Sequence, residues 1–161
     1  MKGNANVLTH LQKLLNSELA ARDQYMAHSR MYKDWGLHEL YERLNHEMEE
    51  ETEHADALIE RMLFLETQPD FSQQDAVKVG SNVKEMLQND LDVEYSVGAA
   101  LKEAIAVCEQ EQDYDTREML VRLLDDTEMD HAYWLEKQLR LIDMVGMQNY
   151  LQSQMGKGDP T

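Results

Sequence analysis

Four long segments of the chain place apolar side chains three or four residues apart, the spacing of one face of an α-helix. They cover residues 5–35, 39–66, 82–111 and 114–144, and a shorter segment of the same kind follows at 147–155. None of them shows the alternation of polar and apolar residues that a half-buried strand requires. The pattern therefore predicts an all-α chain in which each long helix carries one apolar stripe.

The connections between these segments predict how the helices are arranged. Short links join the first helix to the second and the third to the fourth, so each pair should be antiparallel neighbours. The middle link, TQPDFSQQDAVKVGS, is the one segment of loop composition. Its residues, about 15 in number, reach about 50 Å when extended, and a helix of about 28 residues is about 42 Å long. The link is long enough to cross the bundle, which favours a single-domain four-helix bundle over residues 1–161 with one long crossover.

The charge of the chain limits its partners. Its 161 residues include 32 acidic and 15 basic side chains, which gives a formal net charge of −17. Nucleic-acid phosphates and anionic membrane surfaces repel such a chain, so cations are better candidates as ligands. No apolar run has the length of a membrane span or of a signal peptide, which predicts a cytoplasmic protein. Cys108 is the one cysteine, so neither an intrachain disulfide nor a cysteine-based zinc site is expected.

Four glutamates fall at positions where the apolar stripes require an apolar residue: Glu18, Glu51, Glu94 and Glu128. An unpaired carboxylate is expensive to bury, so something must neutralise them. Each lies near the middle of its predicted helix, and mid-helix positions share one level in a bundle of equally long helices. Two of them begin a Glu-x-x-His motif that ends at His54 or His131. This spacing places a carboxylate and an imidazole on one face of an α-helix.

One glutamate from each of two helices, with a Glu-x-x-His pair from each of the other two, is the ligand set of di-iron and di-manganese carboxylate sites. Carboxylate oxygens suit an oxidised metal, and imidazole favours iron over calcium or magnesium. Protons or salt bridges that neutralise four buried acids are the weaker alternative. We therefore predict that six residues bind two metal ions and form the catalytic site: Glu18, Glu51, His54, Glu94, Glu128 and His131.

The sequence resembles the bacterioferritins over nearly its whole length. The likeness lies in NSELAARDQY, RMYKDWGL, HEMEEETEHAD, IERMLFLE, the DLDVE that ends at Glu94, and the E-x-x-H-x-x-WLE of the fourth helix. It implies a ferritin-like bundle with a short fifth C-terminal helix, and a ferroxidase that oxidises Fe(II) at an intrasubunit di-iron centre. It also implies a twenty-four-subunit shell that stores Fe(III) mineral, with a ferredoxin as the partner for iron release. The family's ferroxidase ligands fall on the six residues predicted above.

One position departs from the family's pattern. Bacterioferritins bind haem between paired subunits through a methionine one residue after the first ligand of the second helix, and this chain has Thr52 there. A hydroxyl does not replace a thioether as an axial haem ligand. We therefore expect no haem, as in the haem-less subunit type that forms a shell alone or mixed with a haem-bearing subunit. Met48 and Met31 are nearby but do not occupy the family's position.

Residues beside the predicted centre suggest further roles. His46 resembles a cavity-facing histidine that binds additional iron in the family, with Glu50 as its neighbour, although two solvated polar side chains explain this pair equally well. Tyr25 resembles the family's tyrosine beside the di-iron site, where it donates an electron or a hydrogen bond. Glu47 lies one turn before a predicted ligand, which suggests a supporting or metal-access role. Arg22 lies in the first stripe, where it would neutralise an acid near the site.

Other functions explain part of the pattern. A rubrerythrin-type peroxidase or electron-transfer protein would keep the di-iron site, but usually adds a cysteine-rich iron site that one cysteine cannot form. A non-catalytic acidic interaction module does not require carboxylates in the apolar stripes. A DNA-protecting mini-ferritin places its ligands at a subunit interface and generally lacks a fifth helix. Metal titration and the mass of the assembly separate these functions from a ferroxidase shell.

Overall fold

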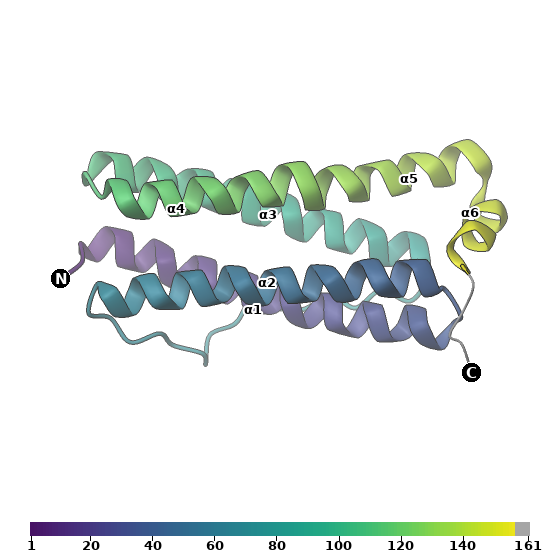
Figure 1. Cartoon of the computed structure of the whole chain (residues 1–161), viewed down its shortest axis with the longest axis horizontal. Coiled ribbons are helices and arrows are strands. Elements are labelled where there is room, and N and C mark those ends of the chain that lie inside the picture. Colours follow the sequence, from purple (N-terminus) through teal and green to yellow (C-terminus); the bar gives the residue numbers. More distant parts are fainter. Residues whose placement is uncertain (157–161) are drawn as a thin grey trace.

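The computed structural model describes residues 1–156, and within this range every regular element is a helix and none is a strand. Long helices pack side by side in a bundle, and a short helix lies across one end of it (Figure 1). The last long helix is continuous but consists of an α-helical, a π-helical and a second α-helical segment. The all-α prediction with a short fifth helix is thereby confirmed. No helix in this range is both long enough and apolar enough to span a membrane. The segments are α1 (Ala5–Asp34), α2 (His38–Phe64), α3 (Val83–Gln110), α4 (Tyr114–Asp125), the π-helix η1 (Asp126–Ala132), α5 (Tyr133–Val145) and α6 (Met147–Gln154).

Local sequence features set the ends of the helices. Asn4 and Asn82 precede α1 and α3, and their side chains accept hydrogen bonds from backbone N–H groups of the first turn. The chain turns after α1 at Gly36, where φ is +81°, and after α5 at Gly146, where φ is +84°. Glycine adopts this left-handed conformation without the strain that a side chain would bring. These residues fix where the long helices start and stop, and therefore the level of their midpoints.

The link between α2 and α3 runs along the outside of the bundle, as Figure 1 shows. Side chains of α1 bind mainly its backbone, although the Ser17 hydroxyl also donates to the Asp75 carboxylate at 2.8 Å. The amide of Gln12 donates to the carbonyl of Asp70 at 2.7 Å and accepts from the Asp70 N–H at 2.9 Å. Farther along, the N–H of Lys78 donates to the Gln24 side-chain oxygen at 3.0 Å. These contacts hold the crossover against α1.

A buried polar group anchors the end of the link. The Gly80 N–H donates to Nε2 of His28 at 3.0 Å, and Nδ1 of the same ring lies 2.9 Å from Asp90 Oδ1. Because Nε2 accepts a hydrogen bond from the backbone, Nδ1 is the nitrogen that carries the ring proton, beside this carboxylate. Gln24 also donates to this Asp90 oxygen, at 2.8 Å. The group joins α1, α3 and the link at one point.

The apolar core of the bundle consists of two clusters. One lies toward the start of α1 and includes Leu15, Leu58 and Leu101, together with the buried Cys108. The other lies toward the end of α1 and includes Leu40. A band of buried polar side chains separates the two clusters: Glu18, Glu47, Glu51, His54, Glu94, Thr127 and His131.

Candidate metal centre

Two groups of three buried side chains meet in the middle of the bundle. The first group is Glu18, Glu51 and His54, and the second is Glu51, Glu94 and His131. Within each group the ligand atoms lie within 4.8 Å of one another. Glu51 belongs to both groups: its Oε2 lies 3.5 Å from Nδ1 of His54, and its Oε1 lies 3.0 Å from Nδ1 of His131. This is the geometry of a carboxylate that bridges two adjacent cation positions.

The two imidazoles face the centre with the same nitrogen. Their rings stack with centroids 5.8 Å apart and planes 20° apart. Nδ1 of His54 lies 3.0 Å from Glu18 Oε2, inside the cluster, whereas its Nε2 lies 3.1 Å from Asp126 Oδ2. In His131, Nδ1 faces the cluster, and Nε2 lies 2.6 Å from Oε2 of Glu50, its hydrogen-bond partner, and 2.6 Å from Oε2 of Glu47. Each ring therefore offers Nδ1 to a metal while an outer carboxylate holds its Nε2–H, as is common for metal-binding histidines.

The histidines and glutamates of the centre shift one another's pKa values. Burial acts to lower the pKa of His54, but hydrogen bonds to Glu18 and Glu51 raise it to about 11. Burial likewise opposes charge on His131, and Glu47, Glu51 and Glu94 raise its pKa above the usual value. Burial also raises the pKa of Glu18 and of Glu94. The protons on the imidazoles offset carboxylate charge, and metal binding must displace them.

The donor set suits divalent cations. Three carboxylate oxygens of the cluster are buried without a hydrogen-bond partner: Glu18 Oε1, Glu51 Oε2 and Glu94 Oε2. Such oxygens are costly to bury because they lose water and gain no donor in exchange. A cation with carboxylate and imidazole ligands supplies the missing interaction, and this ligand chemistry suits iron. The residues therefore fit two adjacent iron ions.

Tyr25 and Arg43 support the centre from two sides. The Tyr25 hydroxyl donates to Oε1 of Glu94. Burial and the nearby carboxylates raise the pKa of Tyr25, so it remains a hydrogen-bond donor. Arg43 donates to Glu47 at 2.6 Å and to the carbonyl of Asp130 at 3.0 Å, which ties α2 to η1. Its guanidinium also lies over the Trp134 ring, 4.7 Å from the centroid.

Glu50 connects the centre to the surface. One of its oxygens lies 2.6 Å from Nε2 of the buried His131, and the other lies 2.5 Å from Nε2 of His46, which is exposed. The two predicted residues thus form a continuous chain of polar contacts with the cluster.

Glu128 and Arg22 do not join the cluster. The Glu128 side chain is 48% exposed, and its Oε2 lies 3.2 Å from Nζ of Lys102. Residues three apart in an α-helix are separated by about 60° around the axis. The hydrogen bonds of a π-helix reach five residues back, so each residue rotates less and the angle between Glu128 and His131 widens. Arg22 is partly buried and pairs with the adjacent Asp23 at 3.0 Å, not with an acid of the centre.

Two residues of the site were not predicted from the sequence. Arg43 is four residues before Glu47, an i, i+4 pair that could have been recognised. Asp126, which contacts His54, gives no comparable signal, because its position depends on the π turn.

A helical bundle with one long crossover and a carboxylate–histidine cluster between its helices is the architecture of ferritin-like proteins. The family model described as the ferritin-like domain matches residues 8–145. The chain is 67% identical over 155 residues to a bacterial ferritin of Synechocystis sp., covering 96% of this chain and 99% of the relative. It is 57% identical to a bacterial ferritin of Pseudomonas aeruginosa (96% and 100% covered) and 37% identical to a bacterioferritin of Mycobacterium leprae (93% and 94%). The chain belongs to the ferritin family, among the bacterial ferritins.

Proposed function

We propose that this protein stores iron and that its central cluster is a ferroxidase site. The observation that carries the proposal is the pair of three-residue groups that share Glu51. Two cations in adjacent positions suit a reaction in which each Fe(II) gives up one electron and a single oxidant takes both. The names of the relatives, bacterial ferritin and bacterioferritin, agree with iron storage.

In this mechanism Fe(II) is the substrate and the chain's residues bind and orient it. Glu18 and His54 hold one ion, Glu94 and His131 hold the other, and Glu51 lies between them. The bound pair supplies two electrons to dioxygen or to hydrogen peroxide. The outer carboxylates fix the histidine rings with Nδ1 toward the metals. Glu128 is the remaining member of the predicted ligand set.

Variants of the second group test the ferroxidase site. We expect Glu94→Ala and His131→Ala to slow the initial oxidation of Fe(II) by roughly ten- to a hundredfold, because each removes a ligand. The rate is followed by the absorbance of the Fe(III) product. Glu60→Ala, which removes an exposed carboxylate from α2, is the matched control and should keep the parent rate. Oxidation at the parent rate in either ligand variant would show that the site is wrongly assigned.

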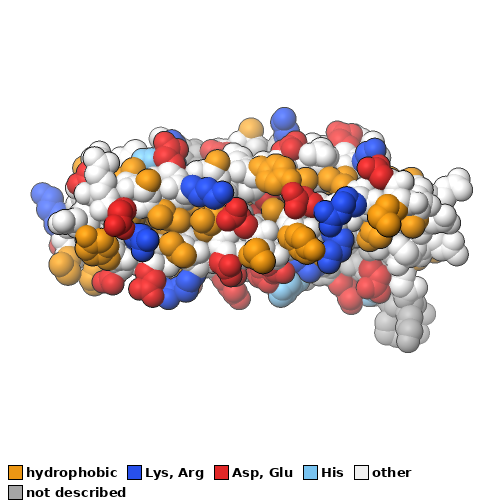
Figure 2. Space-filling view, turned by 90° about the horizontal axis from the view of Figure 1, so that it is seen from above, with side chains coloured by type: hydrophobic (Ala, Val, Ile, Leu, Met, Phe, Trp, Pro, Cys, Tyr) orange, Lys and Arg blue, Asp and Glu red, His pale blue; other side chains and the backbone are white. Residues whose placement is uncertain are grey.

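The second part of the proposal is assembly into a closed twenty-four-subunit shell. The net charge of −17 supports it, because acidic side chains that face an internal cavity attract iron cations. The face formed by α3, α4 and α5 exposes apolar side chains among charged ones of both signs (Figure 2), which offers apolar contact area to a neighbouring subunit. Light scattering during gel filtration should give a mass twenty-four times that of the chain. A stable monomer or dimer at ordinary salt would contradict this part.

The third part is that the shell of this chain alone purifies without stoichiometric haem. Thr52 is exposed on α2, and its hydroxyl donates to the Met48 carbonyl at 3.0 Å, which leaves no soft ligand at this position. The haem spectrum of the purified protein provides the test, and Thr52→Met should create a bis-methionine signal. One tightly held haem for every two chains of the parent would be the opposite result.

A further inference from the structure

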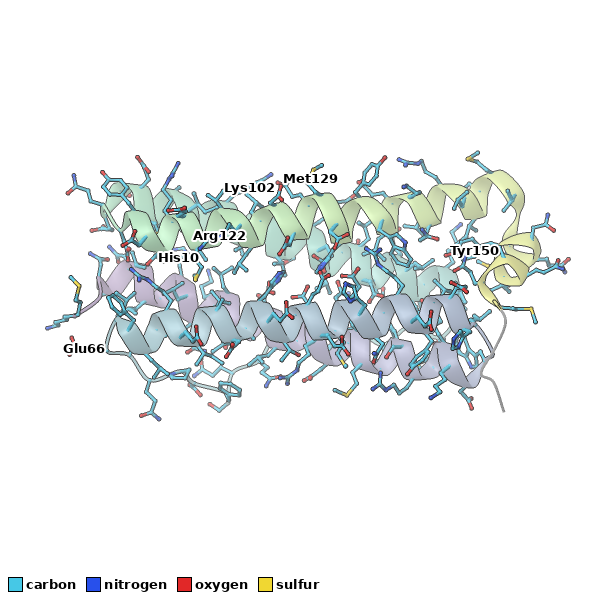
Figure 3. All side chains as sticks on the ribbon, viewed as in Figure 1. His10, Glu66, Lys102, Arg122, Met129 and Tyr150 are labelled. Carbon is cyan, nitrogen blue, oxygen red and sulfur yellow. The ribbon has the colours of Figure 1, made fainter. Side chains whose placement is uncertain are left out.

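The region around Glu128 contains a surface pocket beside the metal centre. The pocket has a volume of about 280 Å³ and lies where α3 meets η1 and α5. Its lining includes the buried Glu94 of the centre as well as the exposed Lys102 and Glu128. Figure 3 shows Lys102 and Met129, the residue after Glu128, on the outer side of the bundle. The pocket therefore places Glu128 between solvent and a residue of the cluster.

The electrostatic attraction on the Glu128 carboxylate depends on whether metal occupies the centre. The Lys102 ammonium, 3.2 Å away, attracts it outward. Divalent cations at the centre would attract it inward, because a bound metal is the largest charge in such a site. A half-exposed ion pair is worth too little to resist that change.

The π-helical segment gives Glu128 a route inward. π-Helical turns inside α-helices are uncommon and frequent at functional sites. The preceding residue, Thr127, is buried with its hydroxyl unpaired, so η1 is not locked there by a side-chain hydrogen bond. Across from it, α3 has Gly98, and the Thr127 methyl would lie 4.0 Å from a Cβ at that position. Gly98 therefore leaves space beside Thr127 where η1 faces α3.

We propose that Lys102 is a latch that holds Glu128 at the pocket, and that divalent metal at the cluster draws Glu128 off the latch to complete the ligand set. The inference rests on the proposed function, since it requires metal at the residues around Glu51. It assigns a role to Lys102, which is a positioning residue and touches no metal. It also explains how one member of the predicted ligand set lies outside the cluster while the other five converge.

A double-mutant cycle with Zn(II) tests the latch without any redox chemistry. Titration calorimetry on the assembled full-length protein compares the parent with Lys102→Gln, Glu128→Gln and the double variant. Lys102→Gln should bind Zn(II) about two- to fivefold more tightly, the scale of a half-exposed ion pair. Glu128→Gln should bind it about tenfold more weakly, because the variant lacks the carboxylate that completes the ligand set. The double variant should match Glu128→Gln in Zn(II) affinity, because Lys102 has no carboxylate at position 128 to hold once Glu128 is replaced.

Arg122→Gln is the matched control: it removes one positive charge from an exposed pair with Glu118, and its Zn(II) affinity should equal that of the parent. An unchanged affinity in Lys102→Gln would overturn the latch. An equal gain with and without Glu128 would also overturn it, since that outcome is a general charge effect. Failure of the proposed function gives a different result. The parent would then show no Zn(II) binding that depends on His131, so His131→Ala would leave the titration unchanged. Hydrogen exchange gives a second readout: the amides of η1 should be protected by Zn(II) in the parent but not in Glu128→Gln.

Discussion

The chain contains the same four-residue motif twice, and the two copies behave differently. In α2, Glu51 and His54 both face the centre, and their side chains are 2% and 5% exposed. In η1, His131 faces the centre with 1% exposure, whereas Glu128 points outward with 48% exposure. The difference follows from the backbone: α2 is α-helical throughout, and η1 is π-helical. Motif spacing places two side chains together only when the hydrogen-bond pattern of the helix is that of an α-helix.

The histidines of the two motifs also differ in their outer partners. Nε2 of His54 meets Asp126, whose side chain is 54% exposed. Nε2 of His131 meets two carboxylates, that of Glu50 at 20% exposure and that of Glu47 at 4% exposure, and Arg43 holds the second. A buried partner is less screened by water and orients the ring more firmly. His131, whose motif partner Glu128 points outward, is thus oriented more firmly than His54.

The first glutamates of the two motifs should give the largest contrast. Glu51→Ala should abolish binding of both Zn(II) ions, because Glu51 belongs to both ligand groups. Glu128→Ala should still bind two ions, with affinity lowered about tenfold. Calorimetric stoichiometry measures both, and circular dichroism checks that the variants are folded. Equal losses in the two variants would remove the distinction between the motifs.

The outer partners should give the next largest effect. Glu47→Gln keeps the shape of the side chain but removes one of the two carboxylates at Nε2 of His131, and should lower Zn(II) affinity about tenfold. Asp126→Asn should lower it about threefold or less, because the exposed carboxylate is screened by solvent. The two affinities are compared under identical salt. A larger loss in Asp126→Asn would reverse the ranking of the two histidines.

Cys108 lies away from both motifs, and burial outweighs the nearby Arg61 cation in setting the pKa of its thiol. Burial raises the pKa of its thiol to about 11, whereas an unfolded thiol titrates near about 8.5. The folded state retains the proton, so this stabilising contribution is complete below about pH 8.5 and is lost as the pH rises toward 11. Between about pH 8 and 10, urea unfolding of the parent should lose about 1–2 kcal/mol relative to Cys108→Ala. Parallel pH profiles for the two proteins would contradict this prediction.

Two buried threonines, one in α4 and one in η1, should give the smallest effects, which change the free energy of unfolding in opposite directions. Thr127→Val removes an unpaired buried hydroxyl and should raise the free energy of unfolding by about 1 kcal/mol. Thr116→Val removes the acceptor of a 2.8 Å hydrogen bond from Arg61 and should lower it by about 1 kcal/mol. Urea unfolding of both variants measures the difference. Destabilisation by Thr127→Val would mean that the hydroxyl has a partner.

The sequence was sufficient for the fold because the fold depends on quantities that a sequence displays. Apolar stripes identify the long helices, and the composition and length of the middle link permit the crossover. Five of the six predicted ligands converge because mid-helix positions share a level. Glu128 could not be placed, since residue spacing does not reveal a π turn, and Asp126 was missed for the same reason. The contact of His28 with Asp90 was also out of reach, because it depends on where the link docks.

Because α1 binds the crossover link mainly through the link's backbone, many substitutions in the link should be tolerated. Gln12, Gln24 and His28 bind N–H and C=O groups that every residue type except proline offers in full, so they place little demand on the identity of the link's side chains. Substitutions should therefore accumulate in the link and be rare at the three α1 positions that hold it. Asp75 and Gly80 are the exceptions, because the Ser17 hydroxyl donates to the Asp75 carboxylate at 2.8 Å and a Cβ at Gly80 would lie 2.8 Å from the Met86 backbone nitrogen. Selection on the connection thus falls on the helix beneath it and on these two positions of the link.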